Sequence, residues 1–244
     1  GNDRVDTDGD GIAESTFETR SYPWNNVDHH PLVAPPWMYF TETVEDGETR
    51  NLVAETSQPQ ETTTASAGDR STLTVGDQGT YDRIQVALDQ ASPGDTIRVG
   101  SGTYHNVVID EEVSLIGVDT GGGKPVIDAD GNEQAIRIRE VPNVRVEGFV
   151  LKNVAEQGGS GIHMVSGAQR AIIKNNTFMT DIGVVLGKDC HNNIIYANDF
   201  SETGTAAGLG GMNKGTNHWN STDPVTYYWN GTQRTGYLGN YYGF

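Results

Sequence analysis

The sequence predicts an all-β chain whose main body is a parallel β-solenoid, and two observations lead to this fold class. Short runs of β-branched and aliphatic residues, including TIRV, VSLI and NIIY, are separated by Gly, Asn and Asp, as in chains of short strands. Two different segments also repeat with one common offset: GIHM at 161–164 recurs as GVVL at 183–186, and IIKNNTF at 172–178 recurs as IIYANDF at 194–200. A repeat of this size with several strands is one coil of a solenoid, in which coils stack about 4.8 Å apart.

The repeat also predicts which side chains lie above one another. Earlier coils are expected at AIRI from residue 135 and VRVEGF from residue 144, so the period drifts upward where loops lengthen. Gly208 is expected to be the equivalent of Gly183 in the next coil. The residues expected to face the core or to stack at a bend are Ile173, Asn176, Phe178, Val184, Leu186, Ile195, Asn198 and Phe200.

Four segments follow from composition and turn signals. Asp46-Gly47 lies between two strand-like runs and indicates a hairpin, and a second hairpin is expected at Asn230-Gly231. GTYDRIQVALDQASPGD reads as one capping helix, with Thr80 as its N-cap and Pro93-Gly94 as its stop. The expected segments are an N-terminal segment at 1–54, a Thr/Ser-rich linker at 55–71, the β-helix at 72–215 and an aromatic closing segment at 216–244.

Composition excludes several classes of function. The net charge of −17 comes from 33 acidic and 16 basic residues, which disfavours binding to nucleic acid. No apolar run reaches the roughly 18 residues of a membrane span, and no signal peptide is evident, so we expect a soluble chain or an excised mature fragment. Cys190 is the only cysteine, so no disulfide can form within the chain.

The segment GTYDRIQVALDQASPGDTIRVGSGTYHNVVIDEEVSLIGV, followed by KPVIDADG, NVRVEGFVLKN and IIKNNTF, resembles the right-handed parallel β-helix proteins of the NosD-like or CASH-domain group, within the pectin-lyase-like superfamily. The group is common on archaeal cell surfaces, so the resemblance implies a right-handed β-helix in an extracellular location. The group's link with copper delivery implies copper ligands. The histidines show no compact ligand spacing, however, and are expected to be surface or turn residues: His29, His30, His105, His163, His191 and His218.

The opening DTDGDG suggests a calcium site. Asp6, Asp8 and Asp10 alternate before a glycine turn, and calcium takes six to eight oxygen ligands. With the carbonyl of Ile12 and the carboxylate of Glu14, these residues are the predicted ligands. The competing interpretation is a solvated acidic turn, because Asp and Gly are ordinary turn residues.

Two further groups of residues are candidates for binding or modification. Three Asn-x-Thr sequons mark possible glycosylation sites, and those in the terminal loops are favoured over the one on a coil. The terminal aromatics form either a sugar-binding platform or, as we favour, a cap on the open solenoid end. The candidate sites are Asn175, Asn220 and Asn230 for glycans, and Trp219, Trp229, Tyr237, Tyr241 and Tyr242 for sugar or interface contacts.

Catalysis is not expected, because the repeated strand faces offer His163, Lys174 and Tyr196 but no set of converging carboxylates. The first hypothesis is a calcium-stabilised structural or adhesive cell-surface module. In the resembled group LGNYY runs into the Asp-rich loop, whereas here the two lie at opposite ends of the chain. We therefore expect either head-to-tail assembly with other copies, which we favour, or closure within one chain. The alternative function is a carbohydrate-binding or carbohydrate-active β-helix.

Overall fold

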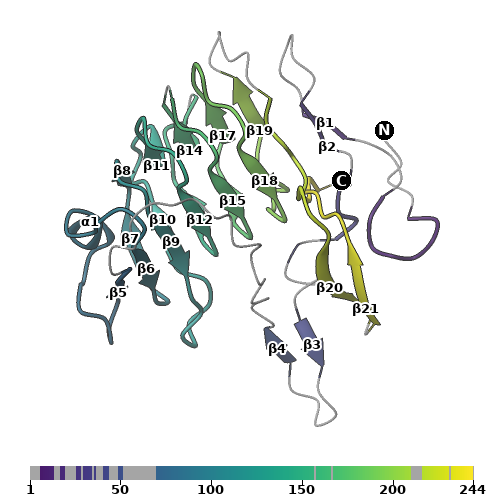
Figure 1. Cartoon of the computed structure of the whole chain (residues 1–244), viewed down its shortest axis with the longest axis horizontal. Helices are drawn as coiled ribbons and strands as arrows, with labels where there is room; N and C mark the ends of the chain where they lie inside the picture. The colour runs from purple at the N-terminus through teal and green to yellow at the C-terminus, as the bar shows by residue number, and fades with distance from the viewer. Residues whose placement is uncertain are drawn as a thin grey trace.

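The computed structural model describes residues 6–13, 17–19, 26–28, 30–34, 36, 41–43, 49–51, 70–156, 158–165, 167–209, 216–230 and 232–243. Within these residues the chain forms a parallel β-solenoid with one short helix (Figure 1). The coils build three parallel sheets, which we name after their last strands, and four successive coils contribute one strand to each sheet. The predicted all-β solenoid is therefore confirmed.

The strands of each sheet come from successive coils. The β18 sheet contains β5 (Thr72–Val75), β6 (Thr96–Val99), β9 (Ser114–Gly117), β12 (Arg145–Glu147), β15 (Ile172–Lys174) and β18 (Ile194–Tyr196). The β16 sheet contains β7 (Thr103–His105), β10 (Val126–Asp128), β13 (Val150–Lys152) and β16 (Thr177–Met179). The β19 sheet contains β8 (Val107–Ile109), β11 (Gln134–Ile138), β14 (Ser160–Met164), β17 (Ile182–Leu186) and β19 (Thr205–Leu209).

The remaining strands form three antiparallel pairs outside the coils. They are β1 (Phe17–Thr19) with β2 (Asn26–Asp28), β3 (Thr41–Thr43) with β4 (Thr49–Asn51), and β20 (Val225–Trp229) with β21 (Thr232–Gly236). The second and third pairs flank the two predicted hairpin turns. Figure 1 shows β1 and β2 beside β19, so the beginning of the chain lies next to the last coils.

The core confirms the predicted register. Ile172 pairs with Ile194 and Ile162 with Val184, both at the offset predicted from the sequence repeat. The apolar residues predicted to face inward are all buried, at 0 to 2% exposure: Ile173, Phe178, Val184, Leu186, Ile195 and Phe200. The rings of Phe178 and Phe200 stack with centroids 4.6 Å apart. Short β-branched strands and an inward phenylalanine stack therefore account for most of the buried interior.

Two details of the prediction are wrong. Leu186 pairs with Leu209, and Gly208 lies opposite Val185 instead of Gly183. The last coil is thus shorter than the glycine spacing suggested, because a glycine has no side chain that fixes which face of the strand it lies on. The helix α1 (Ile84–Leu88) is shorter than expected, and its N-cap is Arg83, without a side-chain cap. Thr80 instead donates its backbone N–H to Thr74 Oγ1 at 3.1 Å and belongs to the preceding turn.

Candidate functional site

A ladder of buried asparagines runs along the corner between the β18 and β16 sheets. Asn176, Asn198 and Asn240 are each 0% exposed. Asn198 Oδ1 accepts hydrogen bonds from the backbone N–H (3.0 Å) and Nδ2 (3.2 Å) of Asn176. Asn240 Oδ1 accepts the same two bonds from Asn198, both at 3.0 Å. Each asparagine therefore accepts the hydrogen bonds donated by the asparagine before it in the ladder. The predicted stacking of Asn176 on Asn198 is confirmed.

The last rung of this ladder is Asp28, from the N-terminal strand β2. The Asp28 side chain is 0% exposed, and its Oδ2 accepts hydrogen bonds from the Asn240 backbone N–H (2.7 Å), Asn240 Nδ2 (3.4 Å) and the Tyr242 hydroxyl (3.1 Å). Its Oδ1 accepts the backbone N–H of His30 at 3.0 Å. Burial raises the pKa of Asp28 to about 7, although these donors act in the opposite direction by favouring the carboxylate.

Backbone and apolar contacts complete this junction, which we call the closing seam: residues 6–13, 26–28 and 30–34 against residues 219–230 and 232–242. The Leu32 N–H donates to Asn240 O at 2.9 Å, and the Gly239 N–H donates to His30 O at 2.6 Å. A Cβ atom at position 239 would overlap the Asp28 carboxylate, so only glycine fits. A small apolar cluster fills the seam with Ile12, Leu32, Ala34, Val225, Tyr227 and Leu238. The two ends of this chain thus form one packed unit.

The acidic loop lies at the edge of the closing seam. Carboxylate oxygens of Asp6, Asp8 and Asp10 lie within 4.8 Å of one another, and the Tyr227 hydroxyl donates to Asp10 O at 3.1 Å. The loop's own N–H groups donate to these carboxylates, from Gly11 to Asp6 Oδ2 at 2.8 Å and from Ile12 to Asp10 Oδ1 at 2.8 Å. Burial raises the pKa of Asp10. The Ile12 side chain is buried in the seam, and the predicted ligand Glu14 lies outside the described residues.

The predicted aromatics lie mainly inside this end of the molecule. Trp219 is 1% exposed and packs against Phe200, which also stacks on Tyr242 at 5.8 Å. Trp229 and Tyr241 are half-buried against the seam cluster. Tyr237 is 40% exposed and stacks on His30 at 5.5 Å. Four of the five rings therefore extend the core, and these rings present no continuous exposed platform.

The three sequons differ in accessibility. Asn230 is exposed at the tip of the β20–β21 hairpin, with a left-handed φ of 50°. Asn220 is half-buried and its Nδ2 donates to Ser221 O at 2.7 Å. The side chain of Asn175 accepts a hydrogen bond from Lys124 Nζ at 3.0 Å. Of the predicted glycan sites, Asn230 thus offers the most accessible amide.

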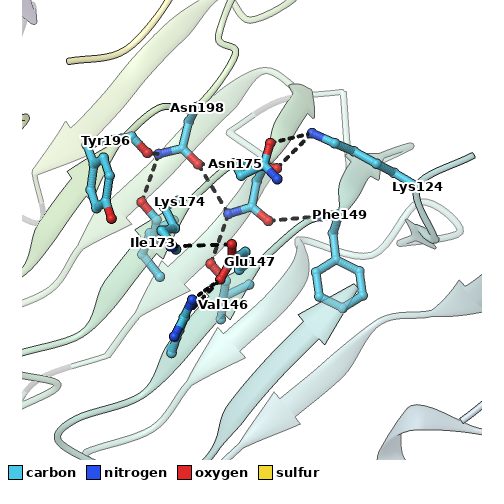
Figure 2. Close-up of polar contacts among 11 residues, drawn as sticks. Lys124, Val146, Glu147, Phe149, Ile173, Lys174, Asn175, Tyr196 and Asn198 are labelled. Atoms are coloured by element: carbon cyan, nitrogen blue, oxygen red, sulfur yellow. Dashed lines mark hydrogen bonds and ion pairs between the residues drawn. The ribbon is translucent and has the colours of Figure 1, made fainter. Parts of the chain in front are cut away.

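A charged cluster on the outer face of the β18 sheet was not anticipated from the sequence. Glu147 lies beside Lys174, and Lys174 beside Tyr196, in register on adjacent strands (Figure 2). Lys174 Nζ lies 3.4 Å from Glu147 Oε1, and the other Glu147 oxygen pairs with Arg145. Burial lowers the pKa of Lys174 and raises that of Tyr196 to about 12. The strands that carry Lys174 and Tyr196 hold no carboxylate themselves, as expected from the sequence; Glu147, on β12, adds one, and two cations neutralise it.

The β19 sheet carries a shallow polar groove of about 460 Å³. Its lining comprises Asn106, Val107, Val108, Gly131, Asn132, Glu133, Gln134 and Arg137. His163 lies beside Arg137 in register, and its pKa is lowered by burial and by that guanidinium. The lining holds one carboxylate, so it does not supply the pair that glycoside hydrolysis requires.

Sequence reasoning did not identify Asp28, Asn240 or Lys124. The sequence held one signal for Asn240. Leu238-Gly239-Asn240 resembles Tyr196-Ala197-Asn198, because in both triplets a residue with a small side chain precedes a buried asparagine. The 42-residue separation from Asn198 conceals this equivalence, because it is about twice the coil period.

Comparison with known proteins gives one family match and two partial structural similarities. Residues 127–243 match the family described as periplasmic copper-binding protein (NosD). Two solved structures are similar in part: a mutant pectin methylesterase in complex with a hexasaccharide (14% identity, 53% of this chain, TM-score 0.36) and the deglycosylated pectin methylesterase from Aspergillus niger (21% identity, 53% of this chain, TM-score 0.27). This chain spans 50% and 58% of their lengths. A search of curated proteins found no match.

The family match corrects the calcium prediction. The matching family is described as copper-binding, so the metal that the match suggests is copper, and no finding supports calcium. The described residues do not fit copper either, because their one group of three potential metal ligands consists of the carboxylates of Asp6, Asp8 and Asp10. Copper sites in proteins use imidazole and sulfur ligands, and Cys190 is buried with its thiol directed at the carbonyls of Met164 and Val165.

None of the helices in the described part of the chain is long and apolar enough to cross a bilayer. The family match covers just under half of the chain and includes every coil from β10 onward as well as the closing segment. The predicted resemblance to the NosD-like β-solenoid proteins is thus confirmed over residues 127–243.

Proposed function

We propose that this chain is a non-catalytic structural module that acts outside the cytoplasm, where the solenoid is a rigid body and the closing seam is its point of attachment. The observation that carries the proposal is the seam itself, in which Asp28 completes a ladder whose previous rung is Asn240. The description of the matching family as periplasmic supports the location.

The charged groups of the described residues support a structural role over a catalytic one. Glu147 is paired with Arg145 and Lys174, and Asp28 is saturated by backbone and side-chain donors. A catalytic carboxylate or base must remain free to exchange a proton with a substrate. Side chains that are bound to one another in this way hold coils together instead.

The seam can also join two copies. Its contacts are formed here within one chain, between residues far apart in the sequence, such as Asp28 and Asn240. The same surfaces would be buried if residues 1–36 of one copy closed the end of the next. Residues 37–71, about 35 residues, would reach up to about 115 Å if fully extended, an upper limit that permits either arrangement. We propose head-to-tail exchange of this segment, which propagates into a filament or closes into a ring.

Deletion of residues 1–36 tests this proposal. Light scattering of the full chain at rising concentration should show assembly, while the deleted chain should remain monomeric, and added 1–36 peptide should bind to it. Asp28→Ala should weaken assembly, whereas Asp110→Ala, at an exposed position, serves as the matched control. A full chain that stays monomeric at the highest concentration would leave closure within one chain as the function of the segment.

A second candidate function is carbohydrate binding at the polar groove on the β19 sheet. The groove presents amide, carboxylate and guanidinium groups from Asn132, Glu133, Gln134 and Arg137, which are suitable partners for sugar hydroxyls. Calorimetry with acidic and neutral oligosaccharides tests this function. Arg137→Ala should abolish binding, and Arg98→Ala, also exposed on a strand, should not; no heat with any oligosaccharide would exclude the groove.

A further inference from the structure

Lys124 is placed differently from the other lysines that the structure describes. Lys152, Lys174 and Lys188 each form an ion pair with a carboxylate. The Nζ atom of Lys124 instead donates two hydrogen bonds to a single residue, to Asn175 O at 2.8 Å and to Asn175 Oδ1 at 3.0 Å (Figure 2). The amine of Lys124 is thus held against a side-chain amide on a coil 51 residues away.

The surroundings of Lys124 favour the uncharged amine. Burial lowers the pKa of Lys124 to about 8, and the carboxylates of Asp199 and Glu147 only partly offset that effect. A lysine whose ammonium is desolvated in this way carries a free electron pair more often near neutral pH than an ordinary lysine does, and this is the form that acts as a nucleophile.

Asn175 is held in place from its other side. Its backbone has a left-handed φ of 54°, its N–H donates to Ala197 O at 3.0 Å, and the next residue is the buried rung Asn176. The side-chain amide therefore projects from a fixed corner of the solenoid toward Lys124. Nζ already contacts Oδ1 of this amide at 3.0 Å, so the amine and the amide group are held next to each other.

We propose that Lys124 and Asn175 are the two partners of an intramolecular isopeptide bond. Nζ attacks Cγ of Asn175, a proton passes from Nζ to Nδ2, the Cγ–Nδ2 bond breaks, and ammonia leaves. The new Nζ–Cγ amide joins the loop before β10 to the corner before β16. Asp199 and Glu147 are the carboxylates that act electrostatically on this amine.

The bond would have two consequences for the molecule. It would close a loop of about fifty residues, so the coils between β10 and β16 could not separate on unfolding. It would also remove Nδ2 of Asn175, the atom to which a glycan attaches in the Asn175 sequon, so cross-linking and glycosylation exclude each other at this position.

Intact mass spectrometry of the chain, produced in a host without N-glycosylation and denatured before measurement, tests the proposal. Loss of ammonia lowers the mass by about 17 Da, and we expect this loss in the wild type after incubation at about pH 9. Tryptic digestion should then yield one species joining residues 99–137 to residues 175–188, because Lys124 precedes a proline and is not cleaved.

Variants separate this bond from other losses of ammonia. Lys124→Arg and Asn175→Ala should retain the mass expected from their sequences, while Lys152→Arg, which alters a lysine on the same sheets, should lose about 17 Da like the wild type. Asn175→Asp should lose water instead, about 18 Da. A wild-type mass that equals the sequence mass after incubation, or a loss that persists in Lys124→Arg, would overturn the proposal.

Discussion

The coils and the closing seam use the same ladder of side chains but obtain its rungs from different places. In the coils, Asn176 and Asn198 are 22 residues apart, and each belongs to the strand segment that it supports. At the seam, Asn240 is 42 residues from Asn198, and Asp28 is 212 residues from Asn240. The coils are therefore stabilised by neighbours in sequence, whereas the seam depends on an N-terminal segment that must return across the whole body.

The largest expected effect lies in the coils. Phe178→Ala should lower the free energy of unfolding by about 3–5 kcal/mol, because it removes a fully buried ring that stacks on Phe200. Urea unfolding followed by circular dichroism measures this change. A loss below about 1 kcal/mol would mean that the coils tolerate cavities, contrary to close packing of this core.

A difference in pH dependence should separate the seam from the coils. The pKa of Asp28 is raised from 3.8 to about 7 in the folded chain, so the folded state binds the proton more tightly than the unfolded state. The contribution of Asp28 is therefore fully present below about pH 4 and is lost as pH rises toward 7, with a slope of about 1.4 kcal/mol per pH unit.

Unfolding of the wild type and of Asp28→Asn between pH 4 and 8 checks this sign. The difference in unfolding free energy between the two proteins should change steadily with pH up to about 7 and then level off. An unchanging difference would indicate that the donors from Asn240, His30 and Tyr242 outweigh burial and keep Asp28 ionised throughout.

An intermediate effect is expected in the middle of the ladder. Asn198→Ala removes the oxygen that accepts two hydrogen bonds from Asn176 and the Nδ2 group that donates to Ile173 O. These buried groups are left unpaired, which together should lower the free energy of unfolding by about 1–3 kcal/mol. Asn106→Ala, at an exposed position, is the control and should change stability by less than about 0.5 kcal/mol. Equal effects of the two substitutions would remove the ladder as a source of stability.

The smallest effect is expected at the one exposed aromatic of the seam. Tyr237→Ala should change the free energy of unfolding by about 0.5 kcal/mol or less, because Tyr237 is 40% exposed and contacts the seam through His30. Thermal unfolding measures this change. A loss of several kcal/mol would show that the ring has a larger role in closure than its exposure indicates.

The sequence predicted the coils well because their register follows from local repetition. Equal offsets at GIHM and IIKNNTF identified the buried residues from Ile173 to Phe200, since inward and outward positions alternate in each strand. Gly208 was misplaced because a glycine has no side chain that specifies a face, so its spacing does not determine the register in which Leu186 pairs with Leu209.

The seam could be predicted only in outline. The aromatic closing segment and the separated LGNYY and Asp-rich motifs indicated that two ends belong together, but not which atoms meet. Asp28 resembles any surface aspartate in the sequence, and its burial depends on Asn240, Leu32 and Tyr227 being brought together by the complete solenoid. Such long-range complementarity has no periodic signal in one sequence.

Hydrogen exchange at the closing segment tests the central claim most directly, that residues 1–36 close the last coil. The backbone N–H groups of Asn240 and Tyr241 donate to Asp28 Oδ2 and Asn198 O, respectively. In the full chain, mass spectrometry should show slow exchange in peptides covering 238–243, and deletion of residues 1–36 should accelerate exchange there while leaving 172–186 unchanged. Equal exchange of 238–243 in both proteins would contradict closure by the N-terminal segment.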